Sequence, residues 1–308
     1  MPTSVVFDSF ETTPEYAPLR EAVAAESWPQ FEAVVAGWPA DQAGFALTAL
    51  AEVDGIESWL AESVSRYASS AFARTALAAR YIVLAWASRG RAHAPQTSDE
   101  QFMGFFEWLA EADPLIAAVV EEHPDFAPAW SAGLTSARGL QLGKHEVLGR
   151  YSMVAAISPR DFPAQTQLLQ SLLPKWSGSW EEAESFVREA TSSPALVPLL
   201  HLERWVDSKP AQARAYLRSA AVLADLREAA TRLPDAPLNP VLVQEHNTFL
   251  MAFYLAGQNA DAERHLHVLG GRVTEFPWRY ASGTQAVLEK VHRDILRQKR
   301  GLFGRTKK

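Results

Sequence analysis

Cysteine is missing from all 308 residues of this sequence. Its absence excludes disulfides, cysteine nucleophiles and the thiolate ligands of zinc and iron–sulfur sites. A cysteine-free chain also fits a reducing compartment, where disulfides are rare. We therefore expect a cytoplasmic protein without cysteine chemistry.

Long apolar runs are missing as well. A membrane-spanning helix needs about 20 consecutive, mostly apolar residues, and the best candidate, residues 76–87, is short and contains Arg80. The first residues, MPTSVVFDSFETTPEY, lack the basic stretch and apolar segment that mark a secretory signal. We expect neither a transmembrane segment nor an export signal.

The sequence contains no motif of nucleotide binding or nucleophilic catalysis. A Gly-x-x-x-x-Gly-Lys loop, a Gly-x-Gly-x-x-Gly turn and a Gly-x-Ser-x-Gly elbow are all absent. Acidic pairs such as Glu121-Glu122 and Glu181-Glu182 lie in patterns typical of a helix surface, not of catalytic carboxylates. We therefore predict no catalytic residue and no cofactor.

Positive charge is concentrated at one end of the chain. The formal net charge is −7, but residues 297–308 carry six positive charges and no acid, so the remaining chain carries −13. An acidic body disfavours specific nucleic-acid binding, because phosphate contacts need clustered Lys and Arg. We expect 298–308 to be a flexible basic tail that aids solubility. The alternative is weak contact of this tail with an anionic surface.

Helical periodicity recurs along the chain, while the period-2 alternation of β-strands is nearly absent. Apolar residues at i, i+3, i+4 and i+7 begin at Phe102, Ala183 and Ala213, and each set forms one stripe along a helix. The almost wholly apolar segment 71–88 suits a helix enclosed by other helices. The ten tryptophans are spread evenly, as expected for fillers between helices.

Several residues predict where helices begin and end. Ser98-Asp-Glu-Gln101 and Ser179-Trp-Glu-Glu182 match the capping box, in which two side chains satisfy free amides reciprocally. Asp41 is expected to cap a helix over 42–53. Most of the 19 prolines lie between periodic segments, Pro114 among them, where we expect them to bound helices and not to kink them.

A repeat is the strongest organisational signal. Pro124, Pro159 and Pro194 are spaced by 35 residues, and Gly143 and Gly178 each lie 19 residues after the first two. A period near 34, with proline closing a helix pair and glycine in the turn, is typical of tetratricopeptide repeats. A later pair, with helices over 241–256 and 262–268, follows the same plan.

These patterns predict an all-α fold of stacked antiparallel helix pairs, a tetratricopeptide-like right-handed solenoid. We expect a disordered end over 1–14, an N-terminal helical region over 15–70, the repeat region over 71–297 and the basic tail over 298–308.

Residues 81–190 resemble a bacterial domain family of unknown function that occurs beside tetratricopeptide repeats. The resemblance is carried by the segments Leu84-Ala-Trp-Ala-Ser-Arg-Gly90 with Ala92 and Ala94, Phe105-Phe106, His123-Pro-Asp125 and Leu173-Pro-Lys-Trp-Ser-Gly-Ser-Trp180. The last segment is the most specific, although the family usually has Gly-Gly where this chain has Ser177-Gly178. The resemblance implies an all-helical fold and carries over no activity.

Two pairs of residues are candidates for a binding site. Arg89 and His93 lie four residues apart near a predicted helix end, where they line a pocket for an anion or, alternatively, cap the helix. Lys175 and Trp176 precede a predicted helix N-terminus, where they hold an acidic group or, alternatively, Trp176 fills a gap between helix pairs. The structural alternative is favoured for both pairs.

A third cluster suggests a metal site only at first sight. Asp261 and Glu263 precede His265 and His267 by four residues each, but the two pairs face different directions on a helix. We expect a solvated helix face and no metal.

The function expected from these features is binding of a protein or peptide partner in a groove of helical repeats. The alternative is an enzyme or small-ligand sensor with a pocket between the central helices, near Arg89, His93 and Trp176. A closed pocket with convergent polar groups favours the alternative, and an open groove favours the scaffold.

Overall fold

The chain folds into helices. The computed structural model describes Phe10 and residues 13–90, 96–176, 178–280, 289–291 and 293–294. Within these residues every regular element is a helix and none is a strand, which confirms the predicted all-α class. None of the helices in this described part is long and apolar enough to cross a membrane. The basic tail and most of segment 1–14 lie outside the described residues.

The chain divides into two compact units. We call Glu15–Ser193 the N-terminal unit, and Pro194–Lys308 together with Met1–Pro14 the C-terminal unit. The division falls inside the segment 71–297, which was predicted to be one repeat region.

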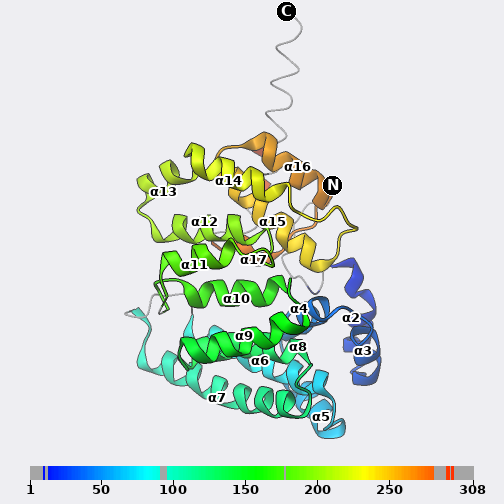
Figure 1. Ribbon diagram of the computed structural model, residues 1–308. Helices are drawn as coiled ribbons and strands as arrows, with labels where there is room; N and C mark the ends of the chain where they lie inside the picture. Colours follow the sequence, from blue (N-terminus) through cyan, green and yellow to red (C-terminus); the bar gives the residue numbers. More distant parts are fainter. Residues whose placement is uncertain are drawn as a thin grey trace, which may run out of the picture. The chain divides into compact units, whose positions relative to one another are not determined.

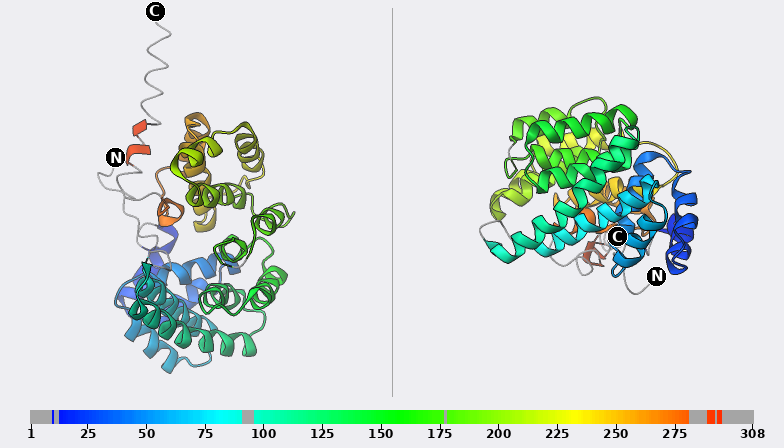
Figure 2. Two further views of the ribbon diagram at one scale, coloured as in Figure 1. Left: turned by 90° about the vertical axis from the view of Figure 1, so that its left-hand side faces the viewer. Right: turned by 90° about the horizontal axis from the view of Figure 1, so that it is seen from below.

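The N-terminal unit is built around α6 (Ala71–Arg89) and α7 (Asp99–Glu122), which lie side by side (Figures 1 and 2). The other helices of this unit are η1 (Pro14–Tyr16, at its border), α2 (Ala17–Ala24), α3 (Trp28–Val35), α4 (Ala40–Ala51), α5 (Glu57–Arg66), α8 (Ala127–Gly139), α9 (Lys144–Ile157), α10 (Phe162–Leu172) and α11 (Trp180–Val187). Helix α8 packs on α9, and α4 packs on both α6 and α8.

Small residues allow α6 and α7 to approach closely. The core they share consists of Ala78, Ile82, Ala85, Phe105, Leu109, Ala112 and Ile116. Helix α8 adds Gly139, where a Cβ would lie 2.5 Å from Leu109 Cδ1. Ten residues of α6 are buried, which confirms that segment 71–88 forms an enclosed helix.

Arginines on the N-terminal half of α6 tie neighbouring elements to it. Arg74 donates two hydrogen bonds to the Glu122 carboxylate at the end of α7, at 2.9 and 2.7 Å. The buried Arg80 guanidinium donates to Glu57 of α5 and to the Ala51 carbonyl of α4, the latter at 2.8 Å. These bonds satisfy charged groups that would otherwise be costly to bury.

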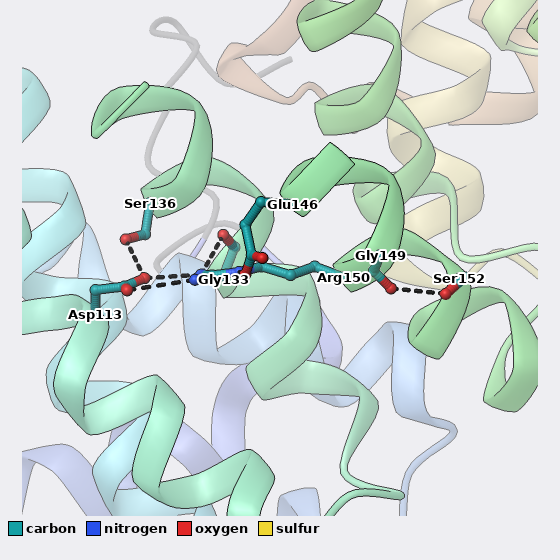
Figure 3. A network of polar contacts seen from close by, with 7 residues as sticks. All are labelled: Asp113, Gly133, Ser136, Glu146, Gly149, Arg150 and Ser152. Carbon is teal, nitrogen blue, oxygen red and sulfur yellow. Dashed lines mark hydrogen bonds and ion pairs between the residues drawn. The ribbon is translucent and has the colours of Figure 1, made fainter. Parts of the chain in front are cut away.

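A second polar network links α7, α8 and α9 (Figure 3). Asp113 of α7 and Arg150 of α9 point toward each other, with 2.7 Å between Arg150 Nη1 and Asp113 Oδ1. Ser136 donates to the same carboxylate at 2.7 Å, and Arg150 also donates to the Gly133 carbonyl and to Glu146. Hydrogen bonds from Arg150 and Ser136 outweigh the opposing effect of burial and lower the pKa of Asp113. The network therefore holds an ionised pair between three helices.

The C-terminal unit surrounds one almost wholly buried helix, α15 (Pro240–Leu255). This helix contacts α12 (Leu196–Asp207), α13 (Pro210–Leu217), α14 (Ala220–Ala230), α16 (Asn259–Leu269) and α17 (Glu275–Trp278). Its buried Asn247 donates to the Val243 carbonyl and accepts a hydrogen bond from Trp278 Nε1 at 2.9 Å. The predicted helices over 241–256 and 262–268 correspond to α15 and α16.

Local capping predictions are partly confirmed. Both bonds of the capping box at Ser98 are present, and Ser179 accepts a hydrogen bond from the Glu182 amide. The prediction that Asp41 caps a helix is wrong, because α4 begins at Ala40 and Pro39 occupies the cap position. Asp41 lies in the first turn instead, where an acid still interacts favourably with the helix dipole.

Two further predictions, one of a helix boundary and one of a continuous helix, are wrong. Pro114 lies inside α7 and does not bound it. The buried residues Ala112 and Ile116 on either side keep α7 packed against α6, which offsets the hydrogen bond lost at proline. The stripe predicted from Ala213 does not continue along a single helix, since α13 ends at Leu217 and Ser219 caps α14.

Candidate functional site

Two of the predicted site residues, Arg89 and Trp176, lie in one group of stacked side chains. We define the tryptophan–arginine cluster as Trp86, Arg89, Arg138 and Trp176. The Arg138 guanidinium lies 5.3 Å from the ring centroids of both Trp86 and Trp176, and the two indoles meet edge to face at 5.9 Å. Arg89 lies 5.8 Å from the Trp86 ring. Cation–π contacts of this kind stabilise the packing of α6, α8 and the turn before α11.

The other two predicted site residues are His93 and Lys175. His93 lies outside the described residues. Lys175 is exposed in the turn that precedes α11. At the end of α6 Arg89 donates to the Gly90 carbonyl at 3.4 Å, and Gln101 donates to the Arg89 carbonyl at 3.2 Å. These contacts support the structural interpretation of Arg89 as a residue that closes its helix.

We expect Trp176→Ala to lower the free energy of unfolding by about 2–3 kcal/mol. Truncation of a buried tryptophan costs about 3–5 kcal/mol, and Trp176 is only partly buried. The variant loses contacts with Trp86 and Arg138. Urea unfolding measures the change, and Lys175→Ala, at the exposed neighbour, is the control with an expected change within about 0.5 kcal/mol. Equal stability of both variants would show that Trp176 is a surface residue.

The histidines of α16 agree with the sequence prediction only in part, since His267 is exposed but His265 is buried. His265 is not on a solvated face: it is buried with Ala262 and Leu269. Its Nδ1 lies 3.0 Å from His246 Nδ1, and its ring stacks on Phe249, with 5.1 Å between ring centroids. Within the described residues no group of three potential metal ligands is present. The pair is therefore a neutral imidazole–imidazole hydrogen bond in the core of the C-terminal unit.

The buried pair of His246 and His265 predicts that the C-terminal unit is less stable at acidic pH. Burial lowers the pKa of His265 to about 3, with smaller contributions from His246 and Arg264, and burial also lowers the pKa of His246. An unfolded histidine titrates near about 6.5. The neutral pair therefore stabilises the fold fully above pH 6.5, and this stability is lost as the pH falls from there toward 3. Each pH unit costs about 1.4 kcal/mol per histidine.

Between pH 7 and pH 5 we expect His265 alone to account for a loss of about 2 kcal/mol in the free energy of unfolding, to which His246 adds. Urea unfolding at both pH values measures it. The control is the double variant His246→Leu, His265→Phe, which keeps an aromatic ring on Phe249 and removes both titrating groups. Its pH dependence should be flatter by the same amount, and identical pH dependence in both proteins would contradict the assignment.

An open pocket of about 830 Å³ lies in the C-terminal unit. We call it the C-terminal pocket. It is formed by the end of α12, α13 with the following Arg218, the end of α15, the first residue of α16, and residues that follow α17. Its aromatic lining residues are Trp205, Tyr254 and Tyr280. All three are partly buried.

The charge of the C-terminal pocket is opposite to that of the chain. Its charged lining residues are Arg214, Arg218, Lys290 and Asp294. Asp294 is compensated, because Lys290 and the Tyr254 hydroxyl both lie at hydrogen-bond distance from its carboxylate, at 3.1 and 2.9 Å. The pocket therefore has an excess of two positive charges in a chain whose net charge is −7.

Arg214 and Arg218 supply this excess. Within the described residues neither makes a hydrogen bond or an ion pair. The Arg218 guanidinium lies over the turn between α15 and α16, where a Cβ on Gly257 would be 3.5 Å from Nη2. By contrast, Arg150 and Arg227 of the same chain bind acidic partners. The two pocket arginines are thus available for a ligand.

A polar chain across α12, α13 and α14 also lies in the C-terminal unit. His201 Nδ1 is 2.6 Å from the Tyr216 hydroxyl, and His201 Nε2 is 2.9 Å from Asp225 Oδ2. A carboxylate accepts hydrogen bonds, so Nε2 donates to Asp225. Tyr216 is not among the residues that line the C-terminal pocket, so the chain serves to join three helices.

Comparison with known proteins identified no relative of this chain. No protein-family model matches the chain, and neither curated proteins nor solved structures include a match. The fold and the pocket therefore define the protein only as an all-helical chain with a cationic, aromatic-lined pocket in its C-terminal unit.

Proposed function

We propose that this protein is a scaffold that binds a peptide segment of a partner protein, and that the segment binds in the C-terminal pocket. The observation that carries the proposal is an open pocket in which aromatic rings lie beside two arginines without acidic partners. Rings of tyrosine and tryptophan offer apolar contact area at a low entropic cost, and arginine is likewise enriched where proteins bind one another. An open pocket admits an extended chain, which a closed one does not.

The proposal includes the finer architecture expected from the sequence. Antiparallel stacking of tetratricopeptide-like pairs in a right-handed solenoid is supported by the 35-residue proline spacing and by the packing of α8 on α9 and of α15 on α16. The resemblance of residues 81–190 to a bacterial domain family of unknown function supports only the all-helical fold. A cytoplasmic location is proposed from the cysteine-free composition.

The alternative, an enzyme or small-ligand sensor, places its pocket near Arg89 and Trp176. There the rings and guanidinium groups of the tryptophan–arginine cluster pack on one another. A ligand would have to separate Arg138 from two indoles and replace both cation–π contacts. The geometry supports the scaffold over the enzyme for this reason.

Selection of random-sequence peptides on the immobilised full chain tests the proposal. We expect enriched peptides that compete with one another and bind with dissociation constants of about 1–100 µM, the range of about 5–8 kcal/mol typical of a single short segment. Binding should remain in Trp176→Phe, which keeps an aromatic ring in the tryptophan–arginine cluster. A selection that enriches no peptide above a column without protein would contradict the scaffold.

A further inference from the structure

The two arginines of the C-terminal pocket are placed to act together. Arg214 lies in α13, and Arg218, four residues further on, is the residue that follows the last turn of this helix; both line the C-terminal pocket. Two like charges at this spacing repel each other and destabilise a helix by about 0.2–0.5 kcal/mol. An acid bound between them would remove that repulsion, and within the described residues the chain supplies none.

We propose that Arg214 and Arg218 form a carboxylate clamp, and that the peptide in the C-terminal pocket is acidic. This inference rests on the proposed peptide-binding function of the same pocket. Guanidinium groups bind planar carboxylates through two parallel N–H···O bonds, a geometry that lysine does not provide. The clamp therefore selects aspartate, glutamate or a chain-terminal carboxylate.

The rest of the pocket favours a peptide over a small phosphate. Trp205 and Tyr280 offer apolar surface that a phosphate ion does not use, but that the side chains beside an acidic residue do. Val206, 47% exposed at the pocket, extends the apolar surface.

The test measures binding of short rhodamine-labelled peptides to the full chain by fluorescence anisotropy in about 50 mM salt, where screening is weak. One peptide alternates glutamate with leucine and has an amidated end. A second carries glutamine in place of glutamate. A third is the glutamine peptide with a free terminal carboxylate, which separates a side-chain carboxylate from a terminal one.

The glutamate peptide should bind about tenfold more tightly than the amidated glutamine peptide, a difference that corresponds to about 1.4 kcal/mol. The double variant Arg214→Gln, Arg218→Gln should abolish the difference. The control Arg66→Gln, Arg264→Gln removes the same charge from two exposed positions outside the pocket and should retain it. Val206→Glu adds an acid at the pocket and should weaken the glutamate peptide alone.

Three results would overturn the clamp. Equal affinity for the glutamate and amidated glutamine peptides would show that the pocket does not recognise the carboxylate, although the protein would still bind peptides. If the control variant loses the preference for the glutamate peptide to the same extent, the preference depends on the net charge of the protein and not on Arg214 and Arg218. Inorganic phosphate that binds through the two arginines, when neither peptide binds, assigns the pocket to a small anion and overturns the peptide-binding function as well. Circular dichroism of each variant verifies that the helices are intact.

Discussion

Gly178→Ala should lower the free energy of unfolding by about 3 kcal/mol or more, the largest effect expected of a single methyl group in this chain. A Cβ on Gly178 would lie 2.0 Å from the Leu172 carbonyl oxygen and 2.3 Å from its carbon. Both atoms belong to the backbone of the last turn of α10, so no side-chain rotation relieves the clash. The turn that connects α10 to α11 would have to open.

The control for this prediction is Gly149→Ala in α9, where a Cβ meets no atom within 4 Å. Alanine at an exposed helical glycine stabilises a helix by about 0.5–1 kcal/mol, so the two identical substitutions should have opposite signs. Thermal and urea unfolding of both variants measure the difference. A stable Gly178→Ala protein would show that α10 and α11 are not joined as described.

Arg150→Met should cost about 3 kcal/mol, because it keeps the aliphatic volume but leaves Asp113 without its counter-charge. Side chains of both residues are largely buried, with 11% and 22% of their surfaces exposed. Asp113 would retain the Ser136 hydroxyl as a partner. Removing one partner leaves a buried charge uncompensated, and this costs more free energy than the intact ion pair contributes to stability.

Glu146→Gln provides the comparison within the same network. Glu146 also contacts Arg150, at 2.8 Å, but 47% of its side chain is exposed, so its ion pair is screened by solvent. We expect a change within about 0.5 kcal/mol in urea unfolding. Equal costs for Arg150→Met and Glu146→Gln would mean that the Asp113 carboxylate is solvated, contrary to the network of Figure 3.

Features that depend on neighbours in sequence could be predicted. The capping box at Ser98 involves residues three positions apart, and the proline before Val241 marks the start of α15 for local steric reasons. The burial of His265 also had a local signal, since Ala262, His265 and Leu269 follow helical spacing. That signal was outweighed by the nearby acids, which suggested a solvated face.

Features that depend on distant residues could not be predicted. Pro114 lies within a continuous helix because its neighbours Ala112 and Ile116 pack in a core shared with α6, a helix that ends at Arg89, far from Pro114 in the sequence. Asp113 and Arg150 are separated by 37 residues. The importance of Arg214 and Arg218 depends on the side chains of α12 and α15, and on Tyr280, Lys290 and Asp294, that line the same pocket. Two arginines one turn apart are common on helix surfaces, and only the pocket distinguishes this pair.

The central claim is that a peptide binds in the C-terminal pocket and not at the tryptophan–arginine cluster. Hydrogen–deuterium exchange of the full chain, with and without a peptide obtained by selection, tests it most directly. We predict slower exchange in α13 and in the turn between α15 and α16 when peptide is bound, with α6 and α8 unchanged. Slower exchange around Trp86, Arg138 and Trp176, with α13 unaffected, would contradict the account and place the binding site in the N-terminal unit.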